Sequence, residues 1–221
     1  MIQAIIFDMD GLLLDSERIV KRSWDEAGDE MGIANMGGHI YHTLGKNREW
    51  RDAYFRETLG DEFPVGEFQK RAGRCFYKIV EHEGMPLKEG VRELLTYAKA
   101  KGYKIAVATS SSREYSIRAL TEAGIFAYLD GGVFGDMVQH SKPDPEIYKK
   151  ACRCIGMPAE ACLALEDSPA GVRSAYAAGL KVIVVPDLLE PPEDVLSLVY
   201  ERCATLHEVI PLLKEGIPRN L

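Results

Sequence analysis

The sequence contains no apolar run near the roughly 20 residues that a membrane-spanning helix needs. No basic segment followed by an apolar stretch and a small-residue cleavage site opens the chain, so we expect no signal peptide. Internal repeats and low-complexity segments are also absent. These absences favour a soluble, cytoplasmic protein without a membrane partner.

Cysteine is scarce and scattered, with five residues in 221: Cys75, Cys152, Cys154, Cys162 and Cys203. This odd number, without a signal peptide, predicts reduced thiols in place of a disulfide framework. Cys152 and Cys154 lie two positions apart on a predicted helix, on different faces, which is a poor arrangement for a shared metal. We expect both to be buried small apolar residues.

Basic residues are fewer than acidic residues, 27 against 34, which gives a net charge of −7. This balance argues against nucleic acid or an anionic membrane as the main partner. A local pocket could still oppose the global charge and bind a small anion. The sequence has no heptad pattern and no obvious exposed apolar stripe, so we expect a monomer.

Short apolar runs rich in β-branched residues predict buried strands at residues 2–8, 103–109, 162–166 and 181–185. Segments with helical periodicity separate or follow them, at 87–101, 112–123, 144–155, 168–178, 193–199 and 205–214. Strands that alternate with helices indicate an α/β fold with a parallel sheet and helices on both faces.

Residues 16–85 interrupt this alternation. No apolar run there resembles a strand, and the pattern predicts amphipathic helices at roughly 16–31, 46–59 and 65–82. We therefore expect a helical insertion between the first strand and the rest of the α/β core.

Polar side chains follow the predicted strands. In open parallel sheets, ligands bind at the carboxyl ends of the strands. Four separate segments bring the following residues to that edge: Asp8, Asp10, Thr109, Ser110, Lys142, Glu166 and Asp167. Crowded carboxylates repel one another, and a hard dication such as Mg²⁺, which prefers oxygen ligands, would compensate them. With a lysine, a hydroxyl and turn amides nearby, the pattern predicts a site for a phosphoryl group.

Two carboxylates on one turn suit phosphoryl transfer. One can attack phosphorus and form an aspartyl-phosphate, while the other protonates the leaving oxygen and then deprotonates water. Asp8 at the strand end and Asp10 in the following turn can divide these roles.

At these residues the sequence resembles the haloacid dehalogenase-like (HAD) superfamily, in its β-phosphoglucomutase-like and sugar-phosphatase branch. Four motifs occur in family order: Asp8-Met9-Asp10-Gly11, Ile105 to Thr109, Lys142 within Ser141-Lys142-Pro143, and Glu166-Asp167-Ser168-Pro169. The resemblance covers essentially the whole chain. It implies a Rossmann-like core at 1–14 and 86–221, with an α-helical cap at 15–85 that closes over the site and selects the substrate.

The resemblance also implies residue roles. Asp8 would be the nucleophile and a metal ligand, and Asp10 the acid/base and a ligand through its backbone carbonyl. Thr109 and Lys142 would hold the transferring phosphoryl group, and Asp167 would complete the Mg²⁺ shell.

Some roles stay open. Glu166 could be a metal ligand or could lie behind the ligands, and the sequence favours the two roles almost equally. Lys46 and Arg48, at the start of the second large cap helix, could meet the substrate's distal groups or form an exposed basic face.

The activity has alternatives. Asp10 favours phosphoryl chemistry over dehalogenation, because dehalogenases of this family usually lack the second aspartate. Related mutases carry a histidine near the position of Val20, so its absence favours a phosphatase acting on a small phosphomonoester such as a sugar phosphate. A hexose-phosphate mutase and a non-catalytic binding protein on the same scaffold are the other hypotheses.

Overall fold

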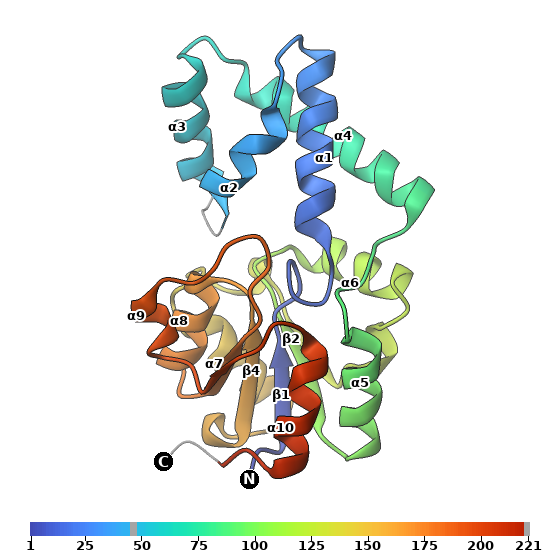
Figure 1. Ribbon diagram of the computed structural model, residues 1–221, viewed down its shortest axis with the longest axis vertical. Helices are drawn as coiled ribbons and strands as arrows, with labels where there is room; N and C mark the ends of the chain where they lie inside the picture. Colours follow the sequence, from blue (N-terminus) through green and yellow to red (C-terminus); the bar gives the residue numbers. More distant parts are fainter. Residues whose placement is uncertain (45–47, 219–221) are drawn as a thin grey trace. The chain divides into compact units, whose positions relative to one another are not determined.

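The computed structural model describes residues 1–44 and 48–218. The chain divides into two compact units, Met1–Asp15 with Met85–Leu221, and Ser16–Gly84. The first unit mixes strands and helices, whereas the second is built from helices (Figure 1).

A parallel sheet forms the centre of the α/β unit. Within the described residues it has six strands, in the order β3-β2-β1-β4-β5-β6. The bounds are β1 Ala4–Phe7, β2 Lys104–Ala108, β3 Gly131–Val133, β4 Cys162–Glu166, β5 Lys181–Val184 and β6 Glu201–Arg202. Phe7 pairs with Val107 on β2 and with Leu165 on β4, so the three central strands end level with one another.

Helices cover both faces of this sheet. Alternate residues of β1, such as Ala4 and Ile6, share one buried cluster with residues of α7 and α8. Figure 1 shows α5 and α10 on the opposite side. The helices of this unit are α5 Val91–Ala100, α6 Arg113–Glu122, α7 Glu146–Cys154, α8 Pro169–Ala177, α9 Glu193–Leu196 and α10 Val209–Glu215. The predicted α/β fold with a parallel sheet is confirmed.

Two strands were missed by the pattern of apolar runs. β3 is a Gly-Gly-Val segment and β6 is two exposed residues at the sheet edge. Neither is long or apolar enough to be recognised from periodicity. Each is a strand because it pairs with a neighbouring strand of the sheet.

The expectation of two buried cysteines on α7 is wrong for one of them. Cys152 is buried in the core, but Cys154 is exposed. Because the two cysteines are two positions apart, they lie on different faces of α7. Only Cys152 of the pair lies on the apolar face that packs in the core.

The two chain segments that leave the α/β unit are paired with each other. The Asp15 amide donates to Pro86 O at 2.9 Å, and the Lys88 amide donates to Leu13 O at 3.1 Å. Lys88 Nζ also bonds Asp187 Oδ1 at 2.5 Å, just beyond β5, and lies 4.0 Å from Asp15 Oδ1. This ion pair attaches the connecting segments to the sheet edge.

The helical unit has its own core. It contains α1 Ser16–Glu30, α2 Ile40–Thr43, α3 Arg48–Leu59 and α4 Val65–Glu83. Phe55 is completely buried, and its ring centroid lies 5.4 Å from Trp24, 5.3 Å from Phe68 and 5.8 Å from Phe63. Aromatic pairs at these separations add to the free energy gained by burying their area.

A membrane-spanning segment would need a long apolar helix. Residues 1–44 and 48–218 include no helix that meets both conditions.

Phe55→Ala should lower the free energy of unfolding of the helical unit by about 3–5 kcal/mol, because it opens a cavity in the aromatic cluster. Urea unfolding followed by tryptophan fluorescence measures this directly, since both tryptophans, Trp24 and Trp50, lie in this unit.

Phe126→Ala is the matched control. This phenylalanine is 41% exposed and lies in the α/β unit, so the tryptophan transition should move little. Equal shifts for the two variants would contradict a separate aromatic core in the helical unit.

Candidate active site

The ends of the central strands place the predicted residues at one edge of the sheet. Asp8 follows β1, and its amide donates to Leu165 O of β4 at 2.9 Å, which extends the ladder by one residue. Thr109 follows β2, and Glu166 ends β4. Because these strands are parallel neighbours in matched register, Asp8, Thr109 and Glu166 share the carboxyl edge, where ligands bind in such sheets.

Lys142 reaches this edge from the loop before α7. Its Nζ donates to Asp8 Oδ1 and to Glu166 Oε1, at 2.5 Å in each case. The side chains of Lys142, Asp8 and Glu166 are only 7%, 9% and 0% exposed. Each of these charges would be costly to bury alone, so the three depend on one another.

The same contacts determine the protonation of the group. Burial raises the pKa of Asp8 to about 7; Lys142 opposes this rise, and Glu166 adds to it. Burial by itself lowers the pKa of Lys142, but its contacts with Asp8 and Glu166 outweigh this and raise it. Lys142 therefore stays charged, and any further positive charge beside Asp8 would favour the ionised carboxylate.

Glu166 is the anchor of this group. Its Oε1 accepts from Lys142 and, at 2.6 Å, from the Tyr148 hydroxyl. Its Oε2 accepts from the Asp167 amide at 3.2 Å and from the Ser168 amide and hydroxyl at 3.4 and 3.2 Å. Burial, then the charges of Glu166 and Asp8, raise the pKa of Tyr148, so its hydroxyl remains a donor.

Glycine makes room for the Glu166 carboxylate. A Cβ on Gly171, in the first turn of α8, would overlap the carboxylate of Glu166. The Gly171 amide also donates to Ser168 Oγ at 3.2 Å, which caps α8. The start of α8 thus approaches the carboxylate closely.

Asp167 lies against the turn that carries the two aspartates. A Cβ on Gly11 would overlap the Asp167 carboxylate, and Gly11 has a positive φ of 85°, which glycine adopts without strain. Asp8, Glu166 and Asp167 each offer one oxygen, and these oxygens lie within 4.8 Å of one another. This all-oxygen set suits a hard cation of the Mg²⁺ type.

Asp10 has a different environment from Asp8. Its Oδ2 accepts from the Ser111 hydroxyl at 2.7 Å and from the Thr109 hydroxyl at 3.4 Å. Its Oδ1 lies 3.4 Å from the Tyr115 hydroxyl, which donates to it. Ser110, which was predicted to bind substrate, is exposed, and its carbonyl packs against Gly135. Its neighbour Ser111 makes the contact with Asp10.

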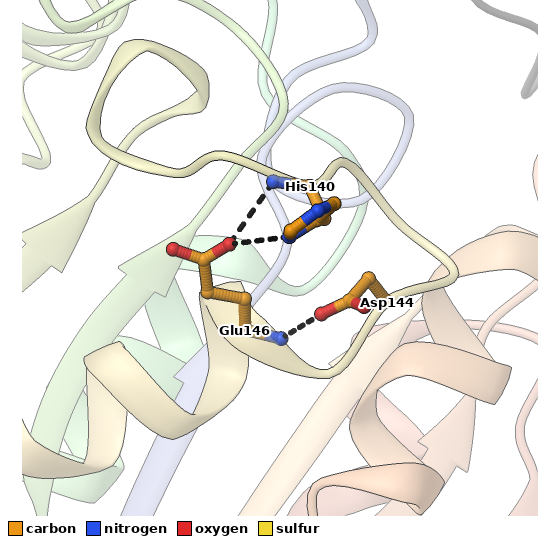
Figure 2. A group of neighbouring side chains, drawn as sticks. All are labelled: His140, Asp144 and Glu146. Carbon is orange, nitrogen blue, oxygen red and sulfur yellow. Dashed lines mark hydrogen bonds and ion pairs between the residues drawn. The ribbon is translucent and has the colours of Figure 1, made fainter.

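The loop that carries Lys142 is closed by Glu146 (Figure 2). Glu146 Oε2 accepts from the Gln139 and His140 amides at 3.0 Å each, and the Glu146 amide donates to Asp144 Oδ1 at 2.9 Å. The hydrogen bond from Lys150, together with these amides, lowers the pKa of Glu146 to about 2. His140, Asp144 and Glu146 could also hold a cation by spacing, but both Glu146 oxygens already accept bonds that shape the loop.

The two predicted basic residues, Lys46 and Arg48, belong to the helical unit. Lys46 lies outside the described residues, and Arg48 begins α3 with a side chain that the structure does not describe.

Sequence reasoning missed Tyr115 and Tyr148, and it chose Ser110 in place of Ser111 from the serines that follow β2. Ser111 belongs to the serine run after β2, which was a usable signal. Tyr115 and Tyr148 lie on α6 and α7, and only the packing of those helices brings their hydroxyls to carboxylates.

Comparison with known proteins identifies the family of this chain. Residues 2–179 match the family of haloacid dehalogenase-like hydrolases. Protein CbbY from Rhodobacter capsulatus is 35% identical over 84% of this chain and 86% of its own. The phosphorylated carbohydrates phosphatase of Thermotoga maritima is 30% identical over 90% and 99% of the two chains.

A solved structure is similar over almost the whole chain. A variant of CbbY from Rhodobacter sphaeroides, in complex with xylulose-(1,5)bisphosphate, aligns with a TM-score of 0.77 at 27% identity. The alignment covers 94% of this chain and 96% of that one.

This chain therefore belongs to the haloacid dehalogenase-like hydrolase family. It is an enzyme, and its relatives place it among the phosphatases of that family.

Gly171→Ala should destabilise the α/β unit by about 1–3 kcal/mol, because the added methyl group must displace the buried Glu166 carboxylate. Chemical unfolding of the purified variant measures the change. The displacement should also disturb Lys142, so phosphatase activity should fall with stability.

Gly73→Ala is the matched control. Gly73 lies within α4, and a Cβ there meets nothing within 4 Å. Alanine should stabilise the helical unit by about 0.5–1 kcal/mol. If Gly171→Ala were as well tolerated, the close packing of Glu166 would be refuted.

Proposed function

We propose that this chain is a Mg²⁺-dependent phosphatase that hydrolyses a small phosphomonoester, a sugar phosphate, through an aspartyl-phosphate on Asp8. The observation that carries the proposal is the buried Asp8 carboxylate, held by Lys142 beside Glu166 and Asp167 at the carboxyl edge of the sheet. The hydroxyl-bonded Asp10 lies on the same turn.

Asp8 acts as the nucleophile. One of its oxygens attacks phosphorus, and the ester P–O bond breaks as the new O–P bond forms. Asp10 gives a proton to the leaving alkoxide. Water then attacks the aspartyl-phosphate, Asp10 takes the proton of that water, and inorganic phosphate leaves while the Asp8 carboxylate is regenerated.

Lys142 and Thr109 hold the transferring group. The Lys142 ammonium neutralises charge on the phosphoryl oxygens from a position that Asp8 and Glu166 already determine. The Thr109 hydroxyl, which accepts from the Ser111 amide at 3.0 Å, lies at the end of β2 on the same edge. Because the ammonium is prepositioned, little reorganisation is needed when charge develops.

The carboxylate set fits Mg²⁺ by its chemistry. Asp8, Asp167 and the backbone carbonyl of Asp10 would hold the ion. Glu166, whose two oxygens already accept from Lys142, Tyr148 and the turn after β4, would lie behind these ligands. When bound, the ion supplies charge neutralisation that lets an anionic nucleophile approach an anionic phosphate.

The substrate class rests on the relatives. One relative is named for phosphorylated carbohydrates, and another was solved with a sugar bisphosphate. We assign residues 1–14 and 86–221 to the catalytic core, and residues 15–85 to a cap that selects the sugar part. The division of the chain into compact units after Asp15 and Gly84 supports this assignment. Val20, near the position where related mutases carry a histidine, favours hydrolysis over isomerisation.

Phosphate release from a panel of sugar, nucleotide and glycolytic phosphomonoesters, with Mg²⁺ and with EDTA, tests the proposal. Wild-type protein should release phosphate from sugar phosphates only with the metal, and Asp8→Asn should lose turnover while remaining folded. Asp8→Asn with near wild-type turnover would refute the nucleophile. Conversion of β-glucose 1-phosphate into an isomer, without phosphate release, would favour a mutase.

Asp10→Asn should lower turnover to an extent that depends on the leaving group of the substrate. Its turnover of a sugar phosphate should fall by about 10²–10⁴-fold, because a poor leaving group needs the proton. p-Nitrophenyl phosphate, whose leaving group needs little protonation, should be slowed much less. Equal slowing of both substrates would remove Asp10 from the acid role.

A further inference from the structure

Tyr148 contacts two of the charged residues at the sheet edge from within the core. The residue is fully buried on α7, in the cluster between that helix and the sheet. Its hydroxyl donates to Glu166 Oε1 at 2.6 Å. Lys142 Nζ donates to the same oxygen at 2.5 Å and lies 5.2 Å from the centroid of the Tyr148 ring.

The ring and the hydroxyl of Tyr148 have separable roles. The ring packs among small apolar residues such as Ala106 and Ala164, and phenylalanine would fill the same space. A hydroxyl buried there is costly unless it is bonded, and in this core its partner is the carboxylate that holds Lys142. The ring therefore accounts for the packing, and the hydroxyl for the hydrogen bond to the charged group.

We propose that Tyr148 is a positioning residue: its hydroxyl fixes the direction of Glu166 Oε1, and through that oxygen it holds the Lys142 ammonium against Asp8. This inference rests on the proposed function, and it adds a residue that does not itself touch the substrate.

The arrangement of donors explains how the hydroxyl acts. Backbone amides and Ser168 hold Oε2 of Glu166, whereas Oε1 accepts from Tyr148 and Lys142. Without the hydroxyl, Oε1 loses a donor that determines its orientation. The ammonium then gains freedom beside Asp8, and its contact with the transferring phosphoryl group becomes less well defined.

Tyr148→Phe tests this directly, because it removes one oxygen and keeps the ring beside Lys142. A hydrogen bond to a charged group has the strength to change a rate about tenfold. We expect kcat for p-nitrophenyl phosphate to fall about tenfold. KM should rise by a smaller factor, about twofold, because the ammonium contributes more when charge develops in the transition state than it does to binding.

Two control variants separate positioning from stability. Ile147→Val shortens a buried neighbour on α7, 1% exposed, and should lower the melting temperature with no change in kcat. Tyr176→Phe removes a hydroxyl from a tyrosine on α8 that is 52% exposed and should change neither quantity. If Tyr148→Phe behaves like Ile147→Val, the hydroxyl is purely structural and the proposal is wrong.

Calorimetric binding of inorganic phosphate supplies a readout besides activity. Tyr148→Phe should weaken binding in the wild-type background but cause no further loss in the Lys142→Met background, because the hydroxyl acts through Lys142. An equal loss in both backgrounds would overturn the proposal.

The outcomes also distinguish this inference from the function itself. A wild-type protein that binds phosphate but hydrolyses no phosphomonoester would refute the phosphatase, while the binding cycle would still decide the role of Tyr148. A wild-type protein that neither binds phosphate nor hydrolyses would overturn both.

Discussion

The ion pair that Lys142 makes with Asp8 and Glu166 is the interaction on which the rest of the site depends. Two parallel strands in register end at this edge, and each brings a carboxylate into a buried position. Two like charges this close and this dry are unfavourable without compensation. The compensating ammonium comes from a loop whose shape Glu146 maintains through the Gln139 and His140 amides. The ion pairs that make this buried sheet edge stable are therefore the same ones that form the proposed site.

Asp8 and Asp10 receive different properties from their surroundings although only Met9 separates them. Asp8 points to a buried cation and to two other carboxylates, an arrangement suited to a nucleophile beside a metal. Asp10 lies among the hydroxyls of Ser111, Thr109 and Tyr115, which are neutral donors at a more accessible position. A carboxyl group that must gain and lose a proton suits the second environment better than the first. The turn between the two residues is what makes this separation possible.

The sequence predicted the strands that carry the site and the motif residues that follow them, because the same apolar runs mark both. β3 and β6 escaped prediction since pairing, and not composition, defines them. Tyr148, which donates to Glu166, escaped for a related reason: it lies on a helix surface whose orientation follows from packing on the sheet. Within three consecutive serines, the sequence does not show which hydroxyl faces the site. The conformation of the loop decides this, and it brings Ser111 to Asp10 in place of the predicted Ser110. Such contacts depend on three-dimensional placement that no local pattern encodes.

The side chains at the sheet edge recognise what all phosphomonoesters share. Lys142 and Thr109 would meet the phosphoryl group, the carboxylates would meet the metal, and Asp10 would meet the bridging oxygen. None of these contacts distinguishes one alcohol from another, so a site built from them alone would accept many esters. Selectivity for a sugar must come from residues that contact the rest of the substrate. In the proposed assignment, the helical unit supplies such residues. Because this unit has its own aromatic core, its surface residues can vary without disturbing the charged group at the sheet edge.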